Sequence, residues 1–280
     1  MLLPVWLVYV LVIGLGLAVG SYLNMALWRL RPDASAGLGR RSVCVHCGRP
    51  LAWYENIPLV SFGALRGRCR TCQGRIPWQY PLVELITAAL FGLAAWHQLD
   101  WFSRFLSIGG LSGIAFWWWA LQLWRDFFFI PLLFFIFVYD LQYQIILSGL
   151  VWAGAVAALV FNLILGSPSL SLTAYRLLLG TIIGGGFFLF QYLVSKGRWI
   201  GGGDVRLGVM MGALLGWPQI IVALFASYLL GSLTVLPLLA LKKKHLRSEI
   251  PFGTFLVIGT LIALWWGSDL IYWYRGVVGF

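Results

Sequence analysis

The sequence predicts an all-α polytopic membrane protein of about eight transmembrane helices, with a small zinc-ribbon-like insert after the first helix. Three observations predict this fold class. Of the 280 residues, 61% are apolar and only 10% are charged, a composition typical of membrane proteins. Apolar runs recur along the chain, most of them near the ~20 residues that cross a bilayer. All four cysteines lie in one polar gap as two C-x-x-C pairs.

The apolar runs place eight helices along the chain. The sixth is short for a crossing and is followed by Pro218, so it is predicted to be a half-helix or a thin part of the bundle. Residues 101–125 are aromatic but interrupted by Gly109 and Gly110, which favours an interfacial or re-entrant segment over a ninth span. The predicted helices cover residues 3–28, 81–98, 120–140, 146–166, 174–195, 205–219, 220–241 and 253–274.

This pattern divides the chain into a first transmembrane helix at 1–28, a polar insert at 29–80 and a membrane bundle at 81–280. Nine of the 20 Lys and Arg residues lie between Arg29 and Arg75. The positive-inside rule therefore predicts a cytoplasmic insert and an external N-terminus. A cleaved signal peptide is the alternative, but no basic segment precedes the first apolar run. These polar gaps explain the net charge of +11, so we expect membrane lipid, and no nucleic acid, as a partner.

The insert contains Cys44, Cys47, Cys69 and Cys72, and 21 residues separate the two C-x-x-C pairs. This spacing is typical of a zinc ribbon. A closed Cys₄ site has no open position for a substrate, so the predicted Zn²⁺ is structural and supplies folding energy to a short polar segment. Disulfides or a redox motif are the alternatives; disulfides conflict with a cytoplasmic location. His46 is expected to be exposed rather than a ligand.

Polar residues without an evident packing role follow the first cysteine pair. They are Glu55, Asn56, Arg66 and Arg68, with Gly67 between the two arginines. Two interpretations remain open: a solvated basic loop near anionic lipid, or a surface that binds a charged ligand.

Two of the nine acidic residues, Asp140 and Asp204, need a functional explanation. Asp140 lies 14 residues after Asp126, or ~21 Å along a helix, which brings it to the inner edge of the hydrocarbon. Asp204 opens a later helix and reaches the same depth from the cytoplasmic side. No catalytic role is expected for the others, which lie in loops or near helix ends: Asp33, Glu55, Glu84, Asp100, Asp126, Glu249 and Asp269.

An intramembrane carboxylate is costly enough to be functional by default. Two that converge titrate as a unit and supply a general base and a general acid, as in aspartic proteases. Gly201–Gly203 permit close approach of a substrate to the backbone. The alternatives are an Asp204 helix cap, an Asp140 that ends its helix in water, and a proton or cation path through a transporter. A non-catalytic assembly factor that docks through the zinc insert is a further alternative.

These motifs together resemble the prepilin peptidases, also called type IV leader peptidases, which are aspartic proteases of the bacterial inner membrane. The resemblance covers nearly the whole chain and rests on "GSYLNMALWRL", "YENIPL", "LRGRCR", "YPLVELITA", "YDLQYQII" and "GGGDVRLG". It implies that Asp140 and Asp204 are catalytic, supported by a loop with Gly201, Gly203 and Arg206.

The resemblance also implies the reactions. The expected activity is removal of a short basic leader from type IV prepilins or pseudopilins at the cytoplasmic face. Many members also N-methylate the new N-terminus with S-adenosylmethionine, an activity associated with the insert, so the region around Gly67 is a hypothetical part of that site. Two positions depart from the family: Ile146-Leu147-Ser148 replaces a motif containing proline, and Arg206 replaces a usual lysine.

Overall fold

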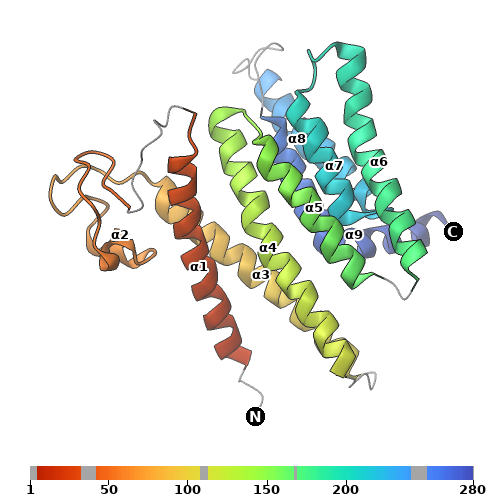
Figure 1. Ribbon diagram of the computed structural model, residues 1–280, viewed down its shortest axis with the longest axis horizontal. Coiled ribbons are helices and arrows are strands. Elements are labelled where there is room, and N and C mark those ends of the chain that lie inside the picture. Colours follow the sequence, from red (N-terminus) through yellow and green to blue (C-terminus); the bar gives the residue numbers. More distant parts are fainter. Residues whose placement is uncertain (1–4, 33–41, 108–112, 167–168, 241–250, 280) are drawn as a thin grey trace. The chain divides into compact units, whose positions relative to one another are not determined.

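The computed structural model describes residues 5–32, 42–107, 113–166, 169–240 and 251–279 (Figure 1). The chain divides into two compact units, Met1–Pro131 and Leu132–Phe280. The long helix α4 passes from the first unit into the second.

All eight predicted helices occur among the described residues, and the all-α fold class is confirmed. Within the described part of the chain, seven helices are long and apolar enough to cross a membrane. The remaining one, α7, has 14 residues and is ~21 Å long, shorter than the ~30 Å hydrocarbon core. The eight are α1 (Val5–Arg29), α3 (Gln79–Ser107), α4 (Gly113–Tyr143), α5 (Ser148–Leu165), α6 (Leu170–Ser195), α7 (Gly202–Leu215), α8 (Gln219–Ala240) and α9 (Phe252–Val278).

Residues 101–125 form no ninth span among the described residues, as predicted, but they belong to two long helices rather than to a segment of their own. Helix α3 continues to Ser107 and α4 already begins at Gly113. The predicted break at Gly109 and Gly110 lies outside the described residues.

The first unit is built on close packing of α1 against α3. A Cβ atom on Gly16 would lie 2.7 Å from the Cα of Ala88, and one on Gly20 would lie 2.6 Å from the Cα of Glu84. Small residues at such positions let two membrane helices approach backbone to backbone. The insert connects these helices and contains a 3₁₀ turn, η1 (Trp53–Asn56), and the short helix α2 (Val60–Ala64).

Asp126 does not lie in a solvated helix end, and that expectation is wrong. Because α4 begins at Gly113, Asp126 lies four turns into it and is 0% exposed. Its carboxylate accepts hydrogen bonds from Gln98 Nε2 at 2.8 Å and from Arg125 Nε and Nη2 at 3.1 and 2.9 Å. This buried cluster ties α4 to α3. Asp269, by contrast, is exposed as expected.

The second unit encloses α7, which packs against α5, α6, α8 and α9. A Cβ atom on Gly208 of α7 would lie 2.5 Å from the carbonyl oxygen of Gly184 on α6. Farther along, Asn162 Nδ2 of α5 donates to the carbonyl oxygens of Ala213 and Leu214, both at 2.8 Å. The short helix is therefore held against its neighbours at its middle and at its C-terminal end.

Candidate functional site

Asp140 lies in the last turn of α4 and is only 4% exposed. Its Oδ2 atom accepts a hydrogen bond of 3.0 Å from the backbone N–H of Thr254, in the first turn of α9. A Cβ atom on Gly253 would lie 2.8 Å from the same oxygen. Asp140 therefore does not end its helix in water: its carboxylate is seated directly on the backbone at the start of α9.

Asp204 is the third residue of α7 and is 8% exposed. Its Oδ2 atom accepts a hydrogen bond of 3.3 Å from the N–H of Gly201, so the carboxylate satisfies a backbone donor at the helix start, as a cap does. The carboxylates of Asp140 and Asp204 also interact electrostatically. Asp204 therefore both caps α7 and lies near Asp140, so the structure brings both predicted acids into one site.

Ile146 joins the starts of α7 and α9 at this site. A Cβ atom on Gly203 would lie 2.9 Å from the Cβ of Ile146, and one on Gly253 would lie 3.1 Å from its Cδ1. The glycine before Asp204 is thus required by close packing as well as by any approach of a substrate. No Cβ on Gly202 would meet a neighbour, so the three glycines differ in role.

The turn after Asp140 closes through its own backbone. Gln144 has φ +54° and donates its N–H to the carbonyl oxygen of Asp140 at 2.8 Å. Ser148 then begins α5, where its Oγ accepts a hydrogen bond from Arg206 Nη1 of α7. The exposed Arg206 thus ties the supporting loop to α5 rather than contacting either carboxylate.

The first turn of α9 was not identified from the sequence as part of this site. Gly253 and Thr254 lie 113 and 114 positions after Asp140, and a contact between a carboxylate and a backbone amide leaves no residue pattern. The available signal was the "PFGT" segment, with Pro251 and a small residue at the start of an apolar helix.

The second candidate site lies in the first unit and consists of the four cysteines. Their Sγ atoms all lie within 4.8 Å of one another and could hold a metal ion. The Sγ atoms of Cys44 and Cys72 are 3.8 Å apart, which is also the edge of a tetrahedron with Zn–S bonds of about 2.3 Å. All four are free thiols rather than disulfides.

The two cysteine pairs lie in turns of the same construction. The N–H of Cys44 donates to the carbonyl oxygen of Arg49, and that of Cys69 to Gly74, both at 2.9 Å. Four residues after each first cysteine the backbone has a positive φ, +68° at Gly48 and +57° at Gln73. Backbone N–H groups of Cys72 and Thr71 lower the pKa of the Cys69 thiol to about 6, which favours the thiolate that binds metal.

His46 is exposed and joins the two turns, as its Nε2 lies 2.9 Å from the carbonyl oxygen of Arg75. A partly buried ion pair supports the first turn from outside. Glu55 accepts a 2.7 Å hydrogen bond from Arg49 Nη2 and one of 2.9 Å from the N–H of Ala52. These bonds hold the pKa of the Glu55 carboxyl below its usual value.

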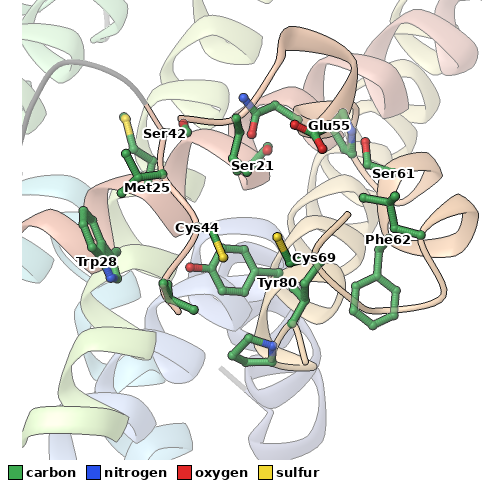
Figure 2. A pocket seen from close by; sticks show the side chains of 18 of the residues that line it. Ser21, Met25, Trp28, Ser42, Cys44, Glu55, Ser61, Phe62, Cys69 and Tyr80 are labelled. Carbon is green, nitrogen blue, oxygen red and sulfur yellow. The ribbon is translucent and has the colours of Figure 1, made fainter. Parts of the chain in front are cut away.

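A cavity of about 420 Å³ lies between α1, the insert and the start of α3, within the size range of small-molecule sites. Trp28, Phe62 and Tyr80 are aromatic residues that line it, and Glu55 lines it too (Figure 2). Cys44 and Cys69 also line this cavity. A ligand there would lie beside the cysteine site.

The fold and its sites define a multi-pass membrane enzyme with paired buried aspartates and a four-cysteine site. Residues 14–98 match the family described as Bacterial Peptidase A24 N-terminal domain, and residues 127–236 match the Type IV leader peptidase family. The chain belongs to the prepilin leader peptidase/N-methyltransferase family.

Curated relatives with the name Prepilin leader peptidase/N-methyltransferase cover nearly the full chain. The Aeromonas hydrophila protein is 33% identical over 96% of this chain and 94% of its own length. The Aeromonas salmonicida protein is 31% identical over 98% and 96%, and the Pseudomonas aeruginosa protein is 31% identical over 95% and 93%. No solved structure matches the chain.

Proposed function

We propose that this protein is a membrane aspartic endopeptidase that removes the leader from type IV prepilins or pseudopilins. The observation that carries the proposal is the convergence of two buried carboxylates, Asp140 at 4% and Asp204 at 8% exposure, at the end of α4 and the start of α7. Buried acids without a basic partner are costly. A catalytic pair that shares one proton would explain why both carboxylates are kept in this buried site.

In the proposed reaction, the ionised aspartate accepts a proton from a water molecule as its oxygen attacks the scissile carbonyl. The protonated aspartate donates a hydrogen bond and then its proton to the carbonyl oxygen. When the tetrahedral intermediate collapses and the C–N bond breaks, one of its hydroxyl groups returns a proton to the ionised aspartate, and the protonated aspartate gives its proton to the leaving amine. The N–H of Thr254 holds Asp140 in one orientation throughout.

The test is the pair of isosteric variants Asp140→Asn and Asp204→Asn, incubated with a prepilin and analysed by mass spectrometry. Each is expected to fold and to lose cleavage, because an amide can neither accept nor deliver the proton. Asp269→Asn, at an exposed aspartate on α9, is the matched control and retains cleavage. Full cleavage by either site variant would refute the pair.

The second proposed activity is N-methylation of the newly exposed N-terminus with S-adenosylmethionine bound in the cavity beside the cysteines. S-adenosylmethionine supplies an electrophilic methyl group on a sulfonium cation. The cavity supports this role because the rings of Trp28, Phe62 and Tyr80 suit adenine stacking and a bound cation. The dual name of the relatives agrees with a second reaction in the same chain.

Gly67 offers a sharp test of the cavity. Its φ is +67° and a Cβ atom there would lie 3.1 Å from the Phe62 ring. Gly67→Ala is therefore expected to strain the backbone, displace Phe62 and lower the transfer of labelled methyl to processed pilin, with cleavage retained. Gly63→Ala in α2 is the matched control, since its Cβ meets no atom within 4 Å. Equal methylation by both variants would contradict this assignment.

The four cysteines are proposed to bind one structural Zn²⁺. The fit rests on four free thiols whose Sγ atoms lie within 4.8 Å. Elemental analysis of the purified protein is expected to give about one zinc per chain, and Cys69→Ser is expected to lose it. Iron, or full folding without metal, would contradict the proposal.

We place the protein in the bacterial inner membrane with the insert in the cytoplasm and the N-terminus outside. The support is the charge bias of the insert, with arginines at both of its ends. Alkaline phosphatase, which folds actively only outside the cytoplasm, should be inactive when fused after Gln73. An active fusion would reverse the orientation.

A further inference from the structure

The insert is tied to the membrane helices at a point well inside α3. The backbone N–H of Leu59 donates a 2.9 Å hydrogen bond to Glu84 Oε2, and Glu84 itself is 7% exposed and packs against Gly20 of α1. Leu59 immediately precedes α2. The start of α2 therefore lies at the level of Glu84.

That level can be placed relative to the membrane. The stretch of α3 that is apolar enough to cross runs Gln79–Asp100. Glu84 is five residues after its first residue, or about 7.5 Å along the helix. This depth corresponds to the boundary between headgroups and acyl chains, where interfacial helices bury their apolar face by ~5–10 Å. Figure 1 shows α2 beside α1 rather than beyond its end.

Several apolar side chains around this anchor are exposed. Val60 is 63% exposed and Ile57 38% exposed. Trp78, just before α3, is 77% exposed, and its ring packs on Phe62 with centroids 5.1 Å apart. Tryptophan at this position is typical of the membrane interface. Water would be a poor solvent for such a surface.

The distribution of charged residues along this segment also agrees with a position at the membrane interface. Residues 56–65, "NIPLVSFGAL", carry no charge at all, and the exposed Arg66, Arg68 and Arg70 follow directly. An uncharged stretch at acyl depth with arginines beside it matches a bilayer whose headgroups are anionic. An acidic protein partner fits less well. It could pair with the arginines, but it would also need an apolar surface at the depth of Glu84 to cover residues 56–65.

We propose that Ile57–Leu65 is an interfacial membrane element, with Val60 in contact with lipid acyl chains and Arg66 and Arg68 at anionic headgroups. The polar insert is thus half immersed, not a domain suspended above the membrane.

One consequence rests on the proposed methyl transfer. Ile57, Leu59 and Phe62 also line the cavity of about 420 Å³, so this element separates the cavity from lipid. A newly cut N-terminus at the end of an apolar helix would then reach the methyl donor without leaving the interface.

The experiment places the photoreactive residue benzoylphenylalanine at Val60 in the full chain, reconstituted in phosphatidylethanolamine–phosphatidylglycerol vesicles. The matched control replaces Val45, an apolar side chain with 44% exposure in the first cysteine turn. After irradiation, mass spectrometry is expected to detect lipid adducts at position 60 at least tenfold above position 45.

Two results would overturn the proposal: equal adduct yields at the two positions, or an adduct at position 60 to protein instead of lipid. The same substitution at Ile57 provides a second reading if the Val60 variant does not fold, as judged by its bound zinc and its cleavage activity. Adduct formation needs no catalysis, so a chain that labels lipid but transfers no methyl group would refute the proposed methyl transfer alone.

Discussion

The substitution Gly253→Ala tests whether the contact between the Asp140 carboxylate and the start of α9 is needed for cleavage. The added Cβ atom would lie 2.8 Å from Asp140 Oδ2, 3.0 Å from its Cγ and 3.1 Å from Ile146 Cδ1. Ordinary contacts between these atoms are ~3.5 Å or longer, so the carboxylate has to move. Moving it breaks the 3.0 Å hydrogen bond from the N–H of Thr254.

The size of the effect follows from that hydrogen bond. A hydrogen bond to a charged group contributes about 1.5–3 kcal/mol. If the loss falls on the transition state, cleavage slows by roughly 10–150-fold at 1.36 kcal/mol per factor of ten. The helix itself is not weakened, because alanine is more favourable than glycine in a helix by about 0.5–1 kcal/mol.

The assay measures kcat/KM for a prepilin together with the thermal midpoint in detergent. Gly276→Ala is the matched control in the same helix, since its Cβ meets no atom within 4 Å, and it should cleave at the normal rate. Unchanged cleavage by Gly253→Ala would refute the seating of Asp140. A large fall in the midpoint with the loss of activity would instead indicate a general packing defect.

Three further outcomes are expected. Gly212→Ala should destabilise by about 1–3 kcal/mol, because its Cβ would meet the Gly180 backbone, whereas Gly186→Ala on the open face of α6 should not lower the thermal midpoint. Asp126→Asn should cost up to about 3–5 kcal/mol by breaking a buried ion pair, and the exposed Asp269→Asn should cost none; equal midpoints would contradict the buried cluster. Glu55→Gln should speed zinc release to a chelator at pH 7. The pKa of Glu55 is lowered by its arginine partner, so this pair stabilises the insert above the unfolded value of about 4.3. The difference from wild type should then close as pH falls below about 4, and a difference that persists there would exclude the ion pair as its cause.

The parts of this protein that the sequence predicts best are those for which a single residue type carries a large free-energy cost. An aspartate in a membrane helix is expensive wherever it lies, which is why Asp140 and Asp204 could be paired from the sequence alone. Cysteine pairs at ribbon spacing are equally specific, and the apolar runs located every long helix to within a few residues at most ends.

The parts that it missed depend on where a helix begins or on contacts with the backbone. Asp126 was assigned to a solvated end because the start of α4 was placed seven residues too late, at 120 rather than Gly113. The seat of Asp140 uses an amide N–H, which every residue except proline possesses. The cavity combines side chains from α1, the insert and α3, and no local pattern encodes such a set.

The matched cysteine turns also determine how the insert can assemble. Each turn closes through its own backbone bonds, Cys44 to Arg49 and Cys69 to Gly74, over a handful of residues. Metal binding then has to close only the intervening loop of 21 residues, at an entropic cost near 2.7 kcal/mol plus a constant, from (3/2)RT ln n. The two turns can therefore form locally as the chain is synthesised, and a bound metal would then join two turns that are already closed.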